Sequence, residues 1–311
     1  MSDKLRVAVV GVGYLGRFHA LIYSRMPHVD LVGVVDTDAE RARAVAAETG
    51  CGVFASAADL LERVDATSVV VPTTAHLEAA EPFLRRGIAV LLEKPIAATL
   101  EDGAAIVRLA ADHGAMLQIG HVERFNAGVM ALAERITVPR YIEAQRMGGF
   151  VERATDVDVV SDLMIHDIDI ILSLVGAEIA QIAAVGASVL TPHVDIASAR
   201  LEFVNGAVAN VVASRVSDKK TRRIRVFQPG RYLSLDFIDQ TIDIAELREV
   251  PGAPRPEIAR ERIQVEPVKP LDLELAEFVR CAREGCRPLV GGHIGLKALE
   301  VALEVQSRIG T

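Results

Sequence analysis

Residues 5–23 of this 311-residue chain read LRVAVVGVGYLGRFHALIY: an apolar run, a glycine-rich turn and the start of a helical pattern. In this context Gly11 allows a tight turn, Gly13 lets the backbone approach a pyrophosphate, and Gly16 lets the helix pack closely on the strand. The pyrophosphate charge would meet the free N–H groups at the helix N-terminus. The stretch therefore predicts a dinucleotide site where the first strand ends.

A carboxylate twenty residues after Gly16 supports this interpretation. Asp36 ends the second apolar run, where it can accept hydrogen bonds from both ribose hydroxyls and would repel a 2′-phosphate. NAD is therefore the expected cofactor, in preference to NADP: Thr37 and Asp38 follow Asp36, and Arg41 comes a helical turn later, so no arginine is immediately adjacent to receive a 2′-phosphate. The alternative is a plain strand-to-helix turn followed by a helix cap. The residues expected to contact the cofactor in these two segments are Gly11, Val12, Gly13, Tyr14, Leu15, Gly16, Asp36 and Thr37.

The first 120 residues alternate short apolar runs with helical patterns, which is typical of a parallel sheet wrapped by helices. We expect an α/β fold whose N-terminal part, residues 1–120, is a doubly wound Rossmann domain. The expected strands are residues 5–10, 31–35, 52–54, 68–71, 88–92 and 116–119, and the expected helices are residues 15–26, 39–49, 57–64, 76–86 and 101–112.

The pattern changes after residue 120. A helix is expected at residues 159–174, followed by strands in which apolar and polar residues alternate, as in an antiparallel sheet with one covered face. Asn205-Gly206 is a strong hairpin signal between two such strands. Residues 251–270 resemble a surface connection, and helices at 272–283 and 294–309 close the chain. We expect residues 121–311 to form an α+β domain with an open, mainly antiparallel sheet for substrate binding and oligomerisation.

Composition excludes several classes of protein. With 34 basic and 42 acidic residues the chain has a net charge of -8, which disfavours nucleic acid as a partner. No segment reaches the roughly 20 apolar residues of a membrane span. Cys51, Cys281 and Cys286 match neither a zinc signature nor a disulfide framework, so we expect no metal and a reducing, cytoplasmic location.

Polar residues with catalytic potential follow two strands and occupy one helix. Lys94 lies where a parallel strand ends, the edge at which such sheets bind ligands, and Pro95 can fix the turn; a solvated surface lysine is the alternative. Asp162, His166 and Asp169 share one face of an otherwise apolar helix. Burying an unpaired charge costs about 3–5 kcal/mol, so we expect this stripe to line a cavity. The alternative is that His166 is a core histidine whose hydrogen bonds are made within the protein and that the carboxylates lie on the helix surface.

These segments, in this order, resemble the glucose-fructose oxidoreductase / inositol dehydrogenase / rhizopine catabolism (Gfo/Idh/MocA) family. The resemblance rests on the glycine turn, Val71-Pro72-Thr73-x-x-His76, Glu93-Lys94-Pro95 and Asp162-x-x-x-His166. Within the family, residues 120–126 (GHVERFN) and 162–169 (DLMIHDID) are similar to a subgroup of UDP-N-acetylglucosamine 3-dehydrogenases. The resemblance implies NAD-dependent oxidation of a sugar hydroxyl, in the subgroup the 3-hydroxyl of a UDP-N-acetylhexosamine. It also implies a cis Lys94–Pro95 bond and a homodimer or homotetramer.

The resemblance assigns catalytic roles to three residues. It implies that His166 is the base and acid, which suits an imidazole with a pKa of about 6.5. It implies that Lys94 polarises the substrate oxygen, and that Asp162 binds the substrate hydroxyl and His166; Lys94 remains an alternative base, because burial lowers the pKa of an amine. Further expected cofactor contacts are Pro72, Thr73, His76, Glu93, Lys94 and His121. The expected substrate contacts are Lys94, Arg124, Asn126, Asp162, His166 and Asp169.

Three alternatives stay open. Arg124 can bind a substrate anion or form a salt bridge with Glu123 or another carboxylate. The substrate can be a sugar nucleotide or a free polyol or hexose such as an inositol. The fold also hosts regulators that bind the dinucleotide without turnover, although the presence of Lys94, Asp162 and His166 together favours an enzyme. We also expect the sheet of the second domain to have an uncovered face of alternating Val, Leu and Ala, which packing against another subunit would bury, so we expect a homo-oligomer.

Overall fold

The computed structural model describes residues 4–150, 157–249, 251 and 255–310, and the chain divides into two compact units. Unit 1 comprises Met1–Val122 and Lys269–Leu299, and unit 2 comprises Glu123–Val268 and Glu300–Thr311. The first division falls at residue 122 where we expected 120. The sequence analysis placed all of residues 121–311 in the second domain, whereas the structure returns residues 269–299 to unit 1.

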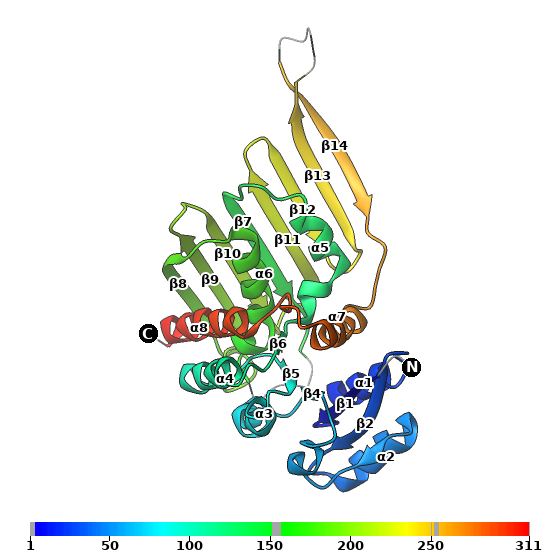
Figure 1. The fold of residues 1–311 in the computed structure, drawn as a ribbon. Helices are drawn as coiled ribbons and strands as arrows, with labels where there is room; N and C mark the ends of the chain where they lie inside the picture. Colours follow the sequence, from blue (N-terminus) through cyan, green and yellow to red (C-terminus); the bar gives the residue numbers. More distant parts are fainter. Residues whose placement is uncertain (1–3, 151–156, 250, 252–254, 311) are drawn as a thin grey trace. The chain divides into compact units, whose positions relative to one another are not determined.

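Unit 1 contains a six-stranded sheet of order β3-β2-β1-β4-β5-β6 in which all pairs are parallel. In Figure 1 the labels β2, β1, β4, β5 and β6 follow one another in this order. The strands are β1 (Leu5–Val10), β2 (Val29–Val35), β3 (Gly52–Val53), β4 (Ala66–Val69), β5 (Ala89–Glu93) and β6 (Leu117–Gly120). The order reverses between β1 and β4, and doubly wound sheets bind ligands at that switch point. The expected Rossmann fold is confirmed.

Helices cover this sheet: α1 (Tyr14–Tyr23), α2 (Ala39–Thr49), α3 (His76–Leu84), α4 (Leu100–Asp112), α7 (Pro270–Glu284) and the first part of α8 (Gly292–Ile309). The helix expected at residues 57–64 is only a 3-10 turn, η1 (Ala57–Leu60), because the chain must reach β4 a few residues later. A second such turn, η2 (Thr73–Ala75), precedes α3. Helix α7 belongs to unit 1 because Leu275, Phe278 and Val279 pack in the same core as Val7 and Val9 of β1.

Unit 2 is built on an eight-stranded sheet of order β14-β13-β12-β11-β7-β10-β9-β8, antiparallel except for the β7–β10 pair. The strands are β7 (Tyr141–Met147), β8 (Ile179–Ala187), β9 (Ile196–Phe203), β10 (Val208–Ser214), β11 (Thr221–Gln228), β12 (Arg231–Asp236), β13 (Thr241–Arg248) and β14 (Glu257–Gln264). The Asn205-Gly206 hairpin is confirmed, with Gly206 at a φ of 81°. The expected surface connection at residues 251–270 is wrong in part, because β14 pairs with β13 there.

The helical segments of unit 2 are η3 (Val122–Phe125), which begins at the last residue of unit 1, α5 (Ala127–Ala133), the π-helical turn η4 (Val160–Met164) and α6 (Ile165–Val175). In Figure 1, α5 and α6 lie on one face of the sheet. That face buries the alternating apolar residues, among them Ala144, Leu201 and Val211. The opposite face carries ion pairs such as Arg225–Glu143 at 2.6 Å. The reasoning from an uncovered apolar face is therefore wrong, and the homo-oligomer stays a prediction that rests on the family resemblance.

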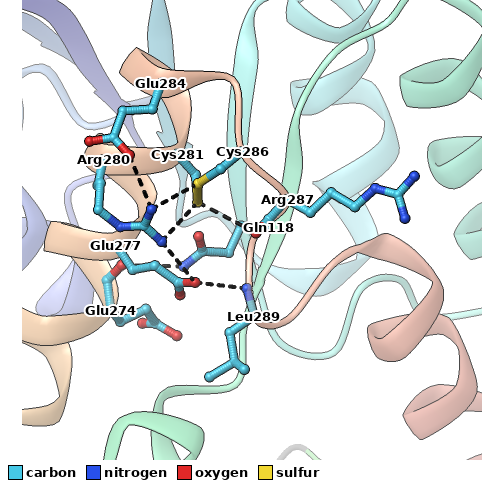
Figure 2. Close-up of a disulfide and its surroundings, with 9 residues drawn as sticks. All are labelled: Gln118, Glu274, Glu277, Arg280, Cys281, Glu284, Cys286, Arg287 and Leu289. Atoms are coloured by element: carbon cyan, nitrogen blue, oxygen red, sulfur yellow. Dashed lines mark hydrogen bonds and ion pairs between the residues drawn. A yellow bond between two sulfur atoms is a disulfide. The ribbon is translucent and has the colours of Figure 1, made fainter.

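A disulfide joins Cys281, near the end of α7, to Cys286 in the following loop (Figure 2). The expectation that the cysteines form no disulfide is therefore wrong, because the turn after α7 brings two residues five apart within bonding distance. Cys51 is the free cysteine of the described part of the chain. Among the described residues, no helix has the length and apolar character needed to cross a bilayer.

Candidate active site

The glycine turn follows β1 directly and opens α1. Gly11 has a φ of 84°, and a Cβ there would collide with the carbonyl oxygen of Val70; a Cβ on Gly16 would collide with the carbonyl oxygen of Gly11. Gly13 instead faces open space, with nothing within 4 Å of a Cβ. As the N-cap of α1 it provides no side-chain acceptor for the first helical N–H groups. Such a turn has both the space and the donors that an anionic pyrophosphate needs.

Asp36 connects the end of β2 to the glycine turn. Its carboxylate accepts hydrogen bonds from the backbone N–H of Val12 and of Asp38, both at 2.8 Å. The expectation that no arginine stands beside it is wrong, since a guanidinium nitrogen of Arg41 lies 3.4 Å from Asp36. Thr37, next in the chain, is exposed.

A cavity of about 540 Å³ lies beside the glycine turn, with Val12, Tyr14 and Arg41 in its lining. Tyr14 is 76% exposed, and Leu15, the next residue of α1, is partly exposed as well. The cavity offers room for part of a dinucleotide on the side of the turn that α2 borders. Pro72, the N-cap of the turn η2, and Thr73, its first residue, lie shortly after β4.

His76, the first residue of α3, is buried. Its ring nitrogens lie 3.2 Å from the carbonyl oxygen of Ile96 and 3.1 Å from that of Val71. Burial lowers the pKa of His76, and a neutral ring has one N–H, so it can donate a hydrogen bond to only one of these two carbonyl oxygens. His76 thus lies between the loop after β4 and the turn after β5, which indicates a positioning role for this predicted cofactor contact.

Lys94 follows β5 directly, and its peptide bond to Pro95 is cis as the resemblance implied. Glu93 is buried at the end of the strand; one carboxylate oxygen accepts a hydrogen bond from the Lys94 N–H at 3.2 Å, and the other lies 3.3 Å from Nε2 of His19. His121 is buried just after β6, the strand that pairs with β5. The residues that follow β4, β5 and β6 therefore meet at the carboxyl edge of the sheet.

Behind Glu93 lies a buried acidic group that sequence analysis missed. Glu274 of α7 is fully buried, and burial, together with the charges of Glu93 and Glu277, raises its pKa well above the ordinary value. The amide of Gln118 on β6 donates a hydrogen bond to the Glu274 backbone carbonyl at 3.2 Å, which fixes α7 to the sheet (Figure 2). The sequence holds no signal for this arrangement, because 156 residues separate the two positions.

In unit 2 the predicted polar stripe begins in a π-helical turn. Asp162 belongs to η4, and His166 and Asp169 belong to α6, among the buried side chains of Ile165, Ile168 and others. Asp169 is buried and pairs with Arg124 at 3.3 Å. That ion pair favours the structural interpretation of Arg124. Asn126 caps α5 by accepting the Gly128 N–H at 2.9 Å, and its amide donates to Glu123.

A second ion pair in the same helix was not predicted. Asp167 accepts two hydrogen bonds from Arg146 of β7, each at 2.9 Å, and Arg146 also donates to Glu123 at 2.7 Å. Arg146 and Asp167 are both buried, so the pair is shielded from solvent. The repeated acidic residues of the stripe were the available signal, but their partner could not be read from the sequence because it lies on a strand 21 residues earlier.

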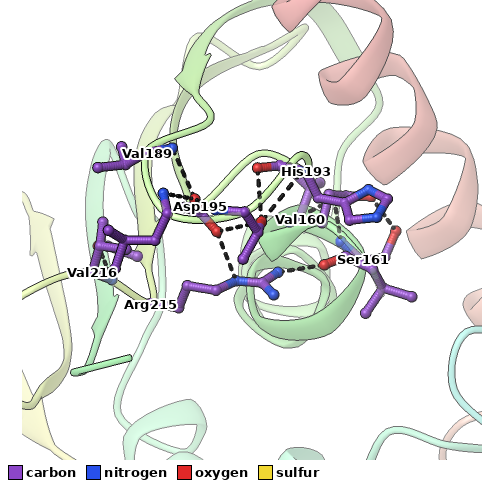
Figure 3. A network of polar contacts seen from close by, with 12 residues as sticks. Val160, Ser161, Val189, His193, Asp195, Arg215 and Val216 are labelled. Carbon is purple, nitrogen blue, oxygen red and sulfur yellow. Dashed lines mark hydrogen bonds and ion pairs between the residues drawn. The ribbon is translucent and has the colours of Figure 1, made fainter. Parts of the chain in front are cut away.

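A cavity of about 450 Å³ opens beside Asp162. Its charged lining also includes Arg146, Arg215, Lys220 and Arg222. Figure 3 shows Arg215 directed toward Asp195, whose carboxylate accepts backbone N–H groups that include Val189 at 2.8 Å. Asp162 therefore lines a cavity that is bordered by cations. His166 and Asp169, which the sequence analysis expected to line the same cavity, do not belong to this lining. Among the described residues no group of three or more His, Cys, Asp or Glu side chains is arranged to hold a metal ion.

The parallel sheet and its glycine turn place the protein in the class of dinucleotide-binding oxidoreductases. Within that class the chain belongs to the GFO/IDH/MocA family. The profile of the oxidoreductase family with an NAD-binding Rossmann fold matches residues 5–121, and the GFO/IDH/MocA C-terminal domain matches residues 130–228. The predicted family, fold class and enzyme class are thus confirmed.

Relatives with assigned activities span both units. A UDP-N-acetylglucosamine 3-dehydrogenase of Acidithiobacillus ferrooxidans is 38% identical over 97% of this chain and 96% of its own length. A solved structure of the enzyme of that name and organism superposes with a TM-score of 0.92, at 38% identity, over 98% of this chain and 97% of the other. A scyllo-inositol 2-dehydrogenase of Bacillus subtilis is 30% identical over 70% of this chain and 69% of its own.

Proposed function

We propose that the protein is an NAD-dependent dehydrogenase acting on the 3-hydroxyl of a UDP-N-acetylhexosamine. The observation that carries the proposal is the similarity to the Acidithiobacillus ferrooxidans enzyme, which extends over 97% of the chain and so includes both units. The predicted catalytic residues support it: Lys94 stands at the ligand-binding edge of the Rossmann sheet, and Asp162 faces a cavity bordered by cations.

The residues of unit 1 fit NAD. The N–H groups at the start of α1 would hold the pyrophosphate, and Gly13 leaves room for its approach. Asp36 would accept the ribose hydroxyls and disfavour a 2′-phosphate, although Arg41 reduces that repulsion. When bound, the nicotinamide supplies the hydride acceptor. Lys94 and His121, at the carboxyl edge of β5 and β6, are the side chains proposed to border it.

The remaining chemistry is proton transfer. We assign His166 as the base that takes the hydroxyl proton as hydride leaves the same carbon, since an imidazole titrates near neutral pH. Asp162 would hold the hydroxyl and favour the protonated imidazole. The Lys94 ammonium would stabilise the negative charge that develops on the oxygen. Lys94 remains the second candidate for the base.

One other function has specific support. The inositol dehydrogenases among the relatives favour a free polyol as the alternative substrate. The regulator without turnover has no such support, because the relatives with assigned activities are dehydrogenases.

A substrate panel tests the proposal. Purified protein with NAD is given UDP-N-acetylglucosamine, UDP-N-acetylgalactosamine, free N-acetylglucosamine or myo-inositol, and NADH formation is followed by absorbance. We expect turnover with a UDP-N-acetylhexosamine and little with the free sugars. Turnover with myo-inositol alone would establish the polyol alternative, and NAD binding without turnover of any of them would favour the regulator.

We further infer a homodimer or homotetramer, on the resemblance to the family, and light scattering can test it. We also infer a cytoplasmic location, because a net charge of -8 and a small-molecule cofactor and substrate suit an enzyme without nucleic acid or membrane partners. The Cys281–Cys286 disulfide is the observation that stands against a reducing compartment.

A further inference from the structure

Two arginines face each other across neighbouring strands in the cavity beside Asp162. Arg146 of β7 and Arg222 of β11 are direct cross-strand partners in the antiparallel register. Both side chains belong to the sheet face that also presents Ala144 and Ile224, the next residues of that face. Like charges placed directly opposite destabilise a sheet, so this pair requires a compensating charge.

Arg146 has its compensation within the protein. It donates two hydrogen bonds to Asp167, each at 2.9 Å, and one to Glu123 at 2.7 Å. Its exposed fraction is 3%, so solvent does not screen these interactions. Arg146 thus forms a fixed part of the cavity wall, and two carboxylates already balance its charge.

Arg222 differs in this respect. Within the part of the chain that the structure describes, its guanidinium makes no hydrogen bond or ion pair, although the side chain is half-buried. Burial and the neighbouring charge of Arg146 lower the pKa of Arg222, which the carboxylates of Glu123, Asp167 and Asp162 offset in part. Lys220, two residues earlier, lines the same cavity, is exposed, and likewise has no charged partner among the described residues.

The two side chains without a hydrogen-bonded or ion-paired partner among the described residues indicate an anionic ligand. A guanidinium fork binds a phosphate through two parallel hydrogen bonds, and a lysine adds a point charge. A neutral polyol would offer the Arg222 guanidinium and the Lys220 ammonium no ionic partner, whereas two phosphates would offer one to each. The cavity, at about 450 Å³, is within the range of small-molecule sites.

We propose that Arg222 and Lys220 bind the diphosphate of a nucleotide-sugar substrate, while Asp162 in the same cavity faces its sugar ring. This inference rests on the proposed function and extends it: the two cations select a nucleotide sugar over a free sugar. Arg215, held by Asp195 and by the carbonyl of Val157 at 2.6 Å, forms the wall beside them.

Calorimetric binding of UDP, without sugar, tests the subsite directly. Arg222→Gln should weaken UDP binding about 10- to 100-fold, which is the effect of losing a hydrogen bond to a charged group. Lys220→Gln should weaken it less, and Arg222→Lys should restore part of the loss, because the charge returns without the fork. Inorganic pyrophosphate should compete with UDP for the wild-type site, whereas uridine should not.

A matched control lies on the same strand. Arg225 of β11 points to the opposite sheet face and pairs with Glu143 at 2.6 Å, so Arg225→Gln should leave UDP binding unchanged. NADH binding should be the same in all variants, because the glycine turn lies in unit 1. Arg222→Gln also removes a like-charge contact, so the Tm of this variant should not be lower than that of the wild type. If Arg222→Gln does not fold, UDP binding by Lys220→Gln, altered at an exposed residue, tests the subsite.

The failures of the two proposals are distinguishable. If the wild type does not bind UDP, or if Arg222→Gln and Lys220→Gln bind it as the wild type does, the subsite is wrong. Turnover of UDP-N-acetylglucosamine by the same preparation, with an unchanged KM in Arg222→Gln, would then leave the proposed function standing. Oxidation of myo-inositol but not of UDP-N-acetylglucosamine would reject the proposed function.

Discussion

At the scale of single residues, the base is the assignment with the sharpest consequence. His166→Ala should lower turnover about 10²- to 10⁴-fold, the usual contribution of general base catalysis, and leave NADH binding nearly unchanged. Lys94→Ala should also lower turnover and weaken NADH binding, because it lies at the edge where the cofactor is proposed to bind. The pH dependence of turnover separates the candidates. If the change of turnover with pH disappears in the His166 variant and persists in the Lys94 variant, His166 is the base. The reverse result assigns the base to Lys94.

Asp36 carries the expected cofactor preference. Asp36→Asn keeps an acceptor for the Val12 N–H but removes the charge, so it should reduce the preference for NAD over NADP about tenfold, the order of one charge-assisted hydrogen bond. Arg41, no longer paired with Asp36, should then contact the 2′-phosphate. Adding Arg41→Ala should therefore cancel the gain for NADP in a comparison of Kd values. A wild type that already uses NADP as well as NAD would contradict the preference.

Glu274 should make stability depend on pH. Its pKa is raised in the folded protein, so above the ordinary glutamate value of about 4.3 the native state holds a proton that the unfolded state has released. Stability from this group therefore falls as pH rises from that value toward the native pKa. Glu274→Gln removes this titrating group. In urea unfolding at about pH 5 and about pH 8, the free energy of unfolding of the variant relative to that of the wild type should therefore be greater at the higher pH.

The control for that measurement is Glu284→Gln, an exposed residue of the same helix that pairs with Arg280. It should follow the wild-type pH dependence. Equal pH dependence in the Glu274 variant and the wild type would show that folding does not raise the pKa of Glu274.

At the scale of helices and strands, the sequence predicted most where the signal is local. Apolar runs and the glycine turn gave β1, β2 and α1 to within a few residues, because strand ends and helix caps depend on neighbouring residues. The π-helical turn at Asp162 was missed, since it differs from an α-helix by one hydrogen-bond step and leaves the apolar pattern intact. Strand β14 was missed because its residues are charged and mostly exposed, without the alternation of a covered strand.

The disulfide after α7 should be visible as a missing pair of thiols. We expect one titratable thiol, that of Cys51, in denatured protein that has not been reduced, and three after reduction. The short loop limits the stabilisation to the order of 2 kcal/mol in the chain-entropy model, so Cys286→Ser should lower Tm only modestly. Alkylation of thiols in intact cells before lysis gives the state in the compartment itself. Three reactive thiols there would show that the bond does not form at the site of function.

At the scale of the whole molecule, the two parts and their classes could be predicted, but the division of the chain between them could not. The change of pattern near residue 120 marks the end of the parallel sheet. No comparable change of pattern shows that residues 269–299 belong to unit 1. An amphipathic pattern indicates that a helix has a buried face, but it does not indicate which core that face packs against. The same reason kept Arg146 and Arg215 out of the predicted site, because their place beside one cavity follows from the sheet and not from local sequence.

That division predicts the effect of truncation. A chain that ends at residue 268 would keep the glycine turn, Asp36 and Lys94 but lose Leu275, Phe278 and Val279 from the core of unit 1. Removing large buried side chains costs about 2–5 kcal/mol each, so the loss approaches the 5–15 kcal/mol by which domains are stable. We expect the truncated protein to lose cooperative melting of unit 1 and to bind no NADH, as measured by circular dichroism and fluorescence titration. The full-length variant Leu273→Ala, altered at a partly exposed position of α7, serves as the control and should bind NADH normally. A truncated protein that still melts cooperatively and binds NADH would show that residues 1–122 fold without α7, as the simpler two-domain division of the sequence requires.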